Sequence, residues 1–100
     1  MKILIASDSH GLTEELSELV RLHPEVTHFI HCGDSELDKN AKELEKYHVV
    51  RGNCDYAPFP NQLLLEAKNE RIFVTHGHLY GVKGNLLRLK YVAEENEATI

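Results

Sequence analysis

A carboxylate and an imidazole, Asp8 and His10, follow directly after the apolar residues 3–6 near the start of the chain. Side chains this close in sequence can reach one ion from a single turn, and both types bind first-row transition metals. Taken alone, an Asp after a strand is better explained as a turn residue or a helix cap. A single buried His is likewise better explained as a hydrogen-bonded core residue, so the metal interpretation needs further ligands.

Further ligands follow three later apolar segments. Asp34, Asn53 and His76 each come just after such a segment, as Asp8 and His10 do. Because ligands of open α/β sheets bind beyond the carboxyl ends of the strands, we expect these five side chains to share one cleft. Carboxylate, amide and imidazole ligands together suit Mn, Fe, Ni or Zn and argue against a thiolate site. The five residues therefore predict a metal site.

Asp34 is the residue that we expect to bind two ions at once. Gly33 precedes it and permits a close approach of the backbone. A carboxylate shared in this way would let two ions lie ~3.5–4 Å apart, the spacing that suits phosphoryl transfer. The sequence therefore predicts a dinuclear centre with Asp34 as its bridge.

The remaining candidates have weaker cases. His78 lies two residues after His76 and could line the cleft, and Cys54 lies in the loop that contains Asn53. His31 precedes the Asp34 loop and could only support a ligand from behind. Packing or surface roles are expected for the other residues: Cys32 in the core, His23, His28 and His48 on faces away from the strand ends, and Lys83, Arg88 and Lys90 on a solvated face.

Strand and helix patterns alternate along the chain, which indicates an α/β fold. Residues 2–7 form an apolar run that is typical of a parallel strand buried on both faces. Thr13 can cap the first helix, and residues 98–100 resemble the start of a further strand. The expected strands are 2–7, 26–32, 47–51 and an antiparallel hairpin of 62–67 with 71–75, and the expected helices are 14–23, 38–46 and 84–95.

Composition excludes several classes of protein. The 100 residues suit one small domain, and a net charge of -5 argues against a general nucleic-acid binder. Two cysteines, Cys32 and Cys54, make neither a disulfide framework nor a Cys-x-x-Cys zinc pair. No segment approaches the ~20 apolar residues of a membrane span, and the amino terminus is unlike a signal peptide. We therefore expect a cytoplasmic protein without membrane contact.

Four ordered motifs resemble those of the calcineurin-like metallophosphoesterases, and most of all their small prokaryotic phosphodiesterase branch. The motifs are Asp8-Ser9-His10, Gly33-Asp34, Gly52-Asn53-Cys54-Asp55 and Thr75-His76-Gly77-His78. They extend over essentially the whole chain. The resemblance implies that residues 1–100 are the N-terminal portion of a metallophosphoesterase domain, an αββα sandwich around two metal ions.

The resemblance also implies a role for each ligand and a reaction. Asp8 and His10 would hold the first metal, Asp34 would bridge both, and Asn53 and His76 would hold the second. A hydroxide bridging two divalent metals would hydrolyse a phosphoester, most simply a phosphodiester. We expect manganese first, with nickel, iron or zinc as alternatives, and a small phosphoester as the substrate.

Two departures from the family pattern bear on activity. Cys54 stands where most of the superfamily has the catalytic His, and a thiol with a pKa near its usual ~8.5 is a poorer proton donor without positive charge. The family's final Gly-His-x-His motif would come after Ile100. We therefore expect a fold that is incomplete at the C-terminus, and a site that lacks one ligand per metal unless a second copy of the chain supplies the loop.

Two other functions compete with the enzyme. A non-catalytic scaffold for protein interaction is one alternative, because the retromer subunit with this fold also lacks the catalytic His. A redox or signalling domain of the flavodoxin type is the other, but it leaves Asn53 and His76 unexplained. Because carboxylates held close together without cations repel each other, the retained ligands favour the enzyme over the scaffold.

Overall fold

Three parallel strands form the first sheet of the computed structural model, which describes residues 1–100. They are β1 (Ile3–Ala6), β2 (His28–His31) and β3 (Tyr47–Val49), in the order β1-β2-β3. Ile5 lies opposite Ile30 in the register of the first pair. All three strands point their carboxyl ends to the same edge of the sheet, the edge at which the sequence predicts the ligands.

An antiparallel hairpin forms the second sheet. It consists of β4 (Gln62–Ala67) and β5 (Glu70–Thr75), close to the predicted bounds. The end of the chain adds to its edge, because the Phe73 N–H donates to the Ile100 carbonyl at 2.9 Å and the Ile100 N–H donates to the Arg71 carbonyl at 3.1 Å. This pattern is that of parallel pairing, so residues 98–100 begin strand-like pairing beside β5, as expected.

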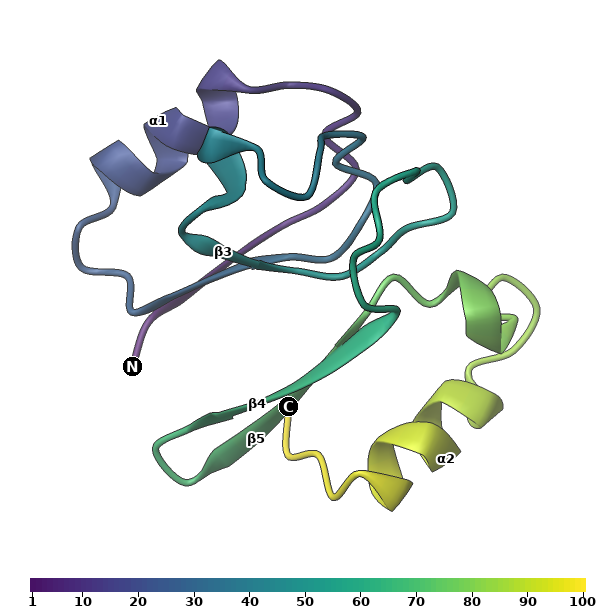
Figure 1. The fold of residues 1–100 in the computed structure, drawn as a ribbon. Coiled ribbons are helices and arrows are strands. Elements are labelled where there is room, and N and C mark those ends of the chain that lie inside the picture. Colours follow the sequence, from purple (N-terminus) through teal and green to yellow (C-terminus); the bar gives the residue numbers. More distant parts are fainter.

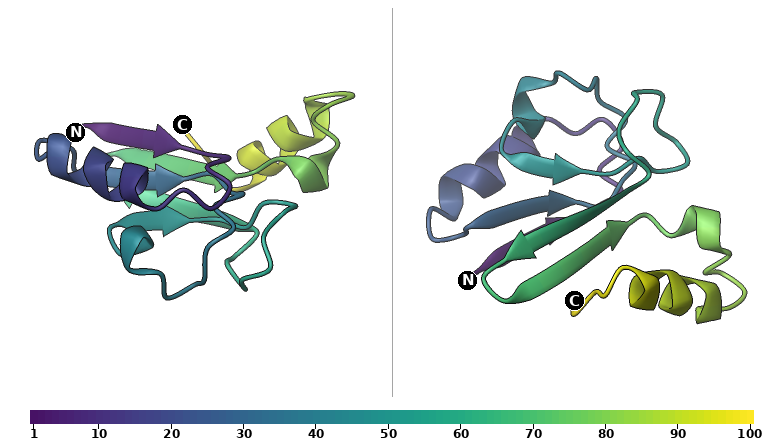
Figure 2. Two further views of the ribbon diagram at one scale, coloured as in Figure 1. Left: turned by 90° about the horizontal axis from the view of Figure 1, so that it is seen from above. Right: turned by 60° about the horizontal axis from the view of Figure 1, so that its bottom comes forward.

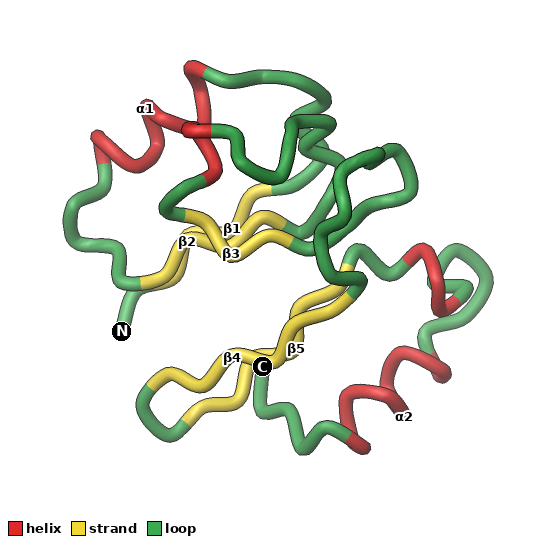
Figure 3. The backbone as a smooth tube through the Cα atoms, viewed as in Figure 1, coloured by secondary structure: helices red, strands yellow, loops and turns green.

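Two α-helices lie on opposite sides of the molecule (Figures 1 and 2). They are α1 (Glu14–Leu22) and α2 (Leu87–Glu95), and short 3-10 turns occur at η1 (Lys42–Leu44) and η2 (His78–Tyr80). Neither nine-residue helix has the length or the apolar content to cross a membrane. Figure 3 shows α1, the first sheet and the hairpin in successive layers, with α2 beside the hairpin.

Two apolar clusters hold these layers together. The first lies between the first sheet and the α1 side, and contains Leu16, Phe29, Leu44, Tyr47, Val49 and Phe59. The second lies between the two sheets and contains Ile30, Val50, Ala67, Ile72 and Val74. Since successive residues of a strand point to opposite faces, β2 contributes to both clusters and is the central strand of the structure.

Helix α1 forms where the sequence predicts it. Its one fully buried side chain, Leu16, packs against the first sheet, and the buried Tyr47 hydroxyl donates to the Leu16 carbonyl at 2.9 Å. Thr13 occupies the N-cap position but makes no side-chain capping bond. The packing of its apolar face therefore positions this helix, and a side-chain cap does not.

The predicted helix over residues 38–46 is wrong. The segment contains a turn, in which the Ala41 N–H donates to the Asp38 carbonyl, followed by the 3-10 turn η1. Asp38 and Asn40 favour local turns over helix interiors, and Leu44 still reaches the core from the shorter structure. The last helix also begins later than predicted, at Leu87 instead of residue 84.

The prediction that the first strand is buried on both faces is also wrong. Strand β1 is an edge strand, and Ile5 is 65% exposed. Ile5 borders an apolar groove whose opposite side includes Leu89 and Ala93 of α2. Composition identified the strand correctly, but order within a sheet decides burial, and hydrophobic pattern does not determine that order.

Candidate metal centre

Two loops at the carboxyl ends of β1 and β2 are joined along their backbones. Asp8 and His10 donate their N–H groups to the carbonyl oxygens of Gly33 and Asp34, at 2.9 and 3.0 Å. Asp8, His10 and Asp34 all have left-handed backbones, with φ angles of 53°, 43° and 59°. Such conformations are uncommon for residues other than glycine and concentrate at functional sites, where the surrounding structure enforces them.

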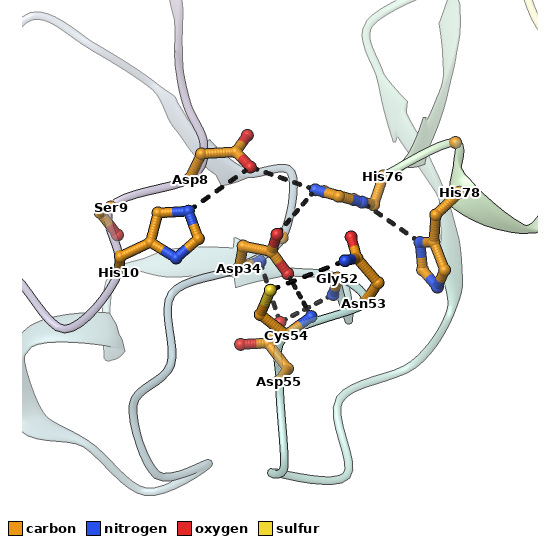
Figure 4. A network of polar contacts seen from close by, with 12 residues as sticks. Asp8, Ser9, His10, Asp34, Gly52, Asn53, Cys54, Asp55, His76 and His78 are labelled. Atoms are coloured by element: carbon orange, nitrogen blue, oxygen red, sulfur yellow. Dashed lines mark hydrogen bonds and ion pairs between the residues drawn. The ribbon is translucent and has the colours of Figure 1, made fainter. Parts of the chain in front are cut away.

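Three of the predicted ligands converge on one point. His76 Nε2 lies 3.3 Å from Asp8 Oδ1 and 3.3 Å from Asp34 Oδ2 (Figure 4). Asp34 is buried, whereas Asp8 is half exposed, so the group opens to solvent on one side. Asp8 and Asp34 come from the first sheet and His76 follows β5. The cluster therefore forms only when the hairpin packs on the first sheet.

The carboxylate of Asp34 is held in a fixed orientation. Its Oδ1 accepts the Cys54 N–H at 2.8 Å, which leaves Oδ2 directed at His76. Gly52 makes this arrangement sterically possible, because a Cβ atom there would lie 2.6 Å from Asp34 Cγ. A Cβ on Gly33 would lie 2.8 Å from His76 Cδ2. Both glycines are thus required for the close approach of these side chains.

Asp55 organises the loops from behind. This buried carboxylate accepts three backbone N–H groups: Gly52 at 2.7 Å and Asp34 at 3.0 Å on Oδ2, and Glu36 at 2.8 Å on Oδ1. Sequence reasoning missed this role. The available signal was an acidic residue ending the Gly52–Asp55 turn, a position from which a carboxylate can accept the N–H groups of its own loop.

His31 joins the first two loops through a neutral ring. It is fully buried, its Nδ1 accepts the Gly33 N–H at 3.1 Å, and Nε2 lies 2.9 Å from Ser9 Oγ. Because Nδ1 is an acceptor, the ring proton resides on Nε2 and is donated to the Ser9 hydroxyl. Burial lowers the pKa of His31, which agrees with this neutral form. The residue supports the Asp34 loop from behind.

His10 is oriented by an acidic neighbour. Its Nδ1 donates to Glu36 Oε1, and its Nε2 lies 3.9 Å from Asp8 Oδ1. The hydrogen bond that His10 donates to Glu36 raises the pKa of His10. Donor atoms of His10, Glu36 and Cys54 also lie within 4.8 Å of one another, next to the Asp8 cluster. Glu36 was not among the predicted site residues.

Asp8 is suited to bind a cation at neutral pH. Partial desolvation acts to raise the pKa of this carboxyl, but hydrogen bonds from Ser7 and His76 outweigh it and lower the pKa overall. The carboxylate is therefore ionised over the whole neutral range. An ionised carboxylate is the form that coordinates metals.

Asn53 and His78 lie next to His76, on the side away from Asp8 (Figure 4). The Nδ1 atoms of His76 and His78 are 3.2 Å apart, and Asn53 lines a cavity with both rings. Asn53 Nδ2 points toward Cys54 Sγ at 3.6 Å. Figure 4 shows Asn53 beside His76 but outside the cluster of Asp8 and Asp34. The structure thus brings the predicted residues to one edge and divides them into two adjacent groups.

Cys54 lies exposed at the same edge. Desolvation, followed by the charges of Asp34 and Glu36, raises the pKa of its thiol. The free side chain is therefore a neutral thiol at pH 7. Bound cations would oppose this effect by compensating the carboxylates.

The other titratable candidates lie away from the cluster. His28 and His48 stack on each other with ring centroids 6.5 Å apart, and His23 pairs with Glu25 at the end of α1. Cys32 packs partly against the core between the sheets. Their positions agree with packing and surface roles.

The donor set fits a divalent cation. Oxygen atoms of Asp8 and Asp34 and a nitrogen of His76 lie within 4.8 Å of one another. Two carboxylates facing one imidazole nitrogen repel each other unless positive charge lies between them. Mixed oxygen and nitrogen donors suit manganese, iron, nickel or zinc.

Comparison with known proteins places this geometry in a family. The model of the calcineurin-like phosphoesterase superfamily domain matches residues 1–100. The probable metallophosphoesterase YsnB of Bacillus subtilis (strain 168) is 53% identical over 102 residues, which cover 100% of this chain and 60% of that protein. The chain thus spans about three-fifths of the length of this relative.

Solved structures agree with the family. A conserved uncharacterized protein of Streptococcus pneumoniae TIGR4, described as a predicted phosphoesterase, aligns with a TM-score of 0.90 and 40% identity, over 96% of this chain and 56% of its own. The phosphoesterase YfcE of E. coli aligns with a TM-score of 0.58 and 27% identity, over 83% of this chain and 61% of its own. These matches confirm the predicted α/β sandwich and the resemblance carried by the four motifs. The chain belongs to the calcineurin-like phosphoesterase superfamily.

Proposed function

We propose that the protein is a metal-dependent phosphoesterase that hydrolyses small phosphodiesters with a pair of divalent cations, manganese being the first candidate. The observation that carries this proposal is the approach of Asp8 Oδ1 and Asp34 Oδ2 to a single nitrogen of His76, at 3.3 Å each. The names of the relatives, a probable metallophosphoesterase and a phosphoesterase, support the same reaction class.

The proposed ligand assignment is the one that the family resemblance implies. Asp8 and His10 would hold one cation, Asn53 and His76 the other, and Asp34 would contact both. When bound, the cations would supply an activated water as nucleophile and compensate charge on the phosphoryl oxygens. The chain itself contributes orientation, because the Cys54 N–H fixes Asp34 and Glu36 fixes the His10 ring.

The decisive experiment measures manganese binding and hydrolysis together. Purified chain is titrated with Mn²⁺ by calorimetry and by electron paramagnetic resonance, and turnover of bis(p-nitrophenyl) phosphate is followed at the same metal concentrations. We expect binding and metal-dependent turnover, both of which Asp34→Asn should reduce at least 100-fold. Asp38→Asn is the matched control, since Asp38 is exposed and outside the centre.

A longer chain provides a second comparison, and a defined negative result would refute the proposal. The same assay is run on a chain extended beyond Ile100 with the remaining residues of the B. subtilis relative, which we expect to bind manganese more tightly. If neither version shows metal-dependent turnover, and Asp34→Asn binds manganese as the unmodified chain does, the enzyme proposal is wrong. A scaffold that binds other proteins would then be the better interpretation.

Cys54 should limit the choice of leaving group. A neutral thiol donates a proton to a departing alkoxide less well than an imidazolium, so the protein should favour good leaving groups. We expect Cys54→His to increase turnover of a diester with a poor leaving group about tenfold or more, and that of bis(p-nitrophenyl) phosphate much less. Equal effects on both esters, or no increase, would contradict this role.

A further inference from the structure

A cavity of about 450 Å³ lies directly beyond His76. It is lined by Asn53, His76, His78 and the four residues Gly81, Val82, Lys83 and Gly84. Two of its walls, Asn53 and His76, are proposed metal ligands, so a molecule bound at the metals would extend into it. Its volume falls within the range of small-molecule sites, about 300–1,000 Å³.

The loop that forms the outer wall has a defined conformation. Gly77 and Gly81 have left-handed backbones, with φ angles of 89° and 62°. A Cβ on Gly77 would lie 3.2 Å from Val82 Cγ2, so the loop packs closely against the residue that follows His76. The Gly84 N–H closes a turn on the Gly81 carbonyl at 3.0 Å. Lys83 lies within this turn.

Lys83 is the only formally charged side chain in the lining. Arg88, the nearby cation, lies over the Tyr80 ring at 5.7 Å, and the Tyr80 hydroxyl donates to Gln62. Lys90 is exposed and does not line the cavity. No carboxylate belongs to the lining, and in Figure 4 Asp8 lies on the side of His76 away from His78 while Asp34 lies between Asp8 and Asn53. One cation with no carboxylate among its neighbours in the lining favours an anionic occupant.

We infer that this cavity is a substrate subsite in which Lys83 selects phosphodiesters that carry a second anionic group, most simply a phosphate, beyond the scissile bond. The inference rests on the phosphoesterase function proposed above and specifies its substrate class. A lysine binds phosphate as a point charge on a flexible stem and needs no fixed bidentate geometry. Because Lys83 is exposed, its contribution should weaken as salt is added.

The test compares two esters with one leaving group. They are p-nitrophenyl thymidine 5′-phosphate and the same compound with a second phosphate on the 3′-hydroxyl. With manganese and low salt, we expect kcat/KM to be about three- to tenfold higher for the bisphosphate, mainly through KM, as expected for one partly exposed charge pair. In Lys83→Met the ratio should fall to about one, and in the matched control Lys90→Met it should stay at the unmodified value.

The outcomes separate this inference from the function on which it rests. If the unmodified protein hydrolyses both esters and Lys83→Met keeps the original ratio, the subsite is wrong while the phosphoesterase proposal stands. If no ester is hydrolysed, binding of thymidine 3′,5′-bisphosphate is measured by calorimetry in the same variants. Affinity lowered about three- to tenfold by Lys83→Met alone supports the subsite, and equal affinity in all three proteins overturns it.

Discussion

Replacing Asp55 with asparagine is expected to lower the free energy of unfolding by about 3 kcal/mol. The carboxylate accepts the N–H groups of Gly52, Asp34 and Glu36, and a hydrogen bond to a charged acceptor contributes about 1.5–3 kcal/mol. Asparagine retains one acceptor oxygen, which can serve the pair on Oδ2 as weaker neutral bonds. Its NH₂ group would then face the Glu36 N–H, so that bond is lost completely.

Urea unfolding without added metal measures this effect. The matched control is Asp38→Asn, which makes the same chemical change at an exposed position just after the Asp34 loop. It should alter the free energy of unfolding by less than about 0.5 kcal/mol. Manganese affinity provides a second measurement, since the Asp34 N–H exchanges a charged acceptor for a weaker neutral one in the Asp55 variant alone. If both variants unfold at the same urea concentration and bind manganese equally, Asp55 does not organise the loops.

Three further predictions concern the backbone and the core. Gly52→Ala should cost more than about 3 kcal/mol and abolish manganese binding, because its Cβ overlaps the Asp34 carboxylate. Gly84→Ala meets only the Gly81 carbonyl oxygen, at an ordinary contact distance of 3.8 Å, and should be neutral by the same unfolding and calorimetric measurements. Burial lowers the pKa of His31, so below the unfolded value near 6.5 the unfolded chain gains a proton that the folded protein excludes. The free energy of unfolding should therefore decrease as the pH is lowered, by at most about 1.4 kcal/mol per pH unit. His31→Gln should remove that slope between pH 7 and 5, and unchanged slopes in urea titrations would refute it. Tyr47→Phe should cost about 1 kcal/mol in thermal or urea unfolding through its lost hydrogen bond, and the same change at the exposed Tyr56 nothing measurable.

The sequence was sufficient to predict the strands and the edge at which the polar residues gather. Apolar runs that end in Asp8, Asp34 or His76 are local patterns, and the rule that strand ends share an edge converts them into a common location. The turn before Leu44 was predicted as helix because its apolar spacing satisfies both structures. Spacing alone does not show that Asp38 and Asn40 will form a turn first.

The finer geometry of the centre lay outside such patterns. The left-handed backbones of Asp8 and His10 result from pairing with the neighbouring loop, a contact between segments distant in sequence. The Asp55 contacts depend on the approach of two loops, and the exposure of Ile5 depends on strand order. Each of these features is set by tertiary structure, which period and propensity do not encode.

The position of His76 has a consequence for the order of events in folding. Its ring meets Asp8, which is 68 positions away in the chain, and the two residues belong to different sheets. Contacts of such long range form late, because the cost in chain entropy must be met before they contribute. A pair of cations that shares Asp34, with Asp8 on one ion and His76 on the other, would therefore act as a cross-link added after the sheets have docked. It should slow unfolding in proportion to its occupancy while leaving the folding rate nearly unchanged.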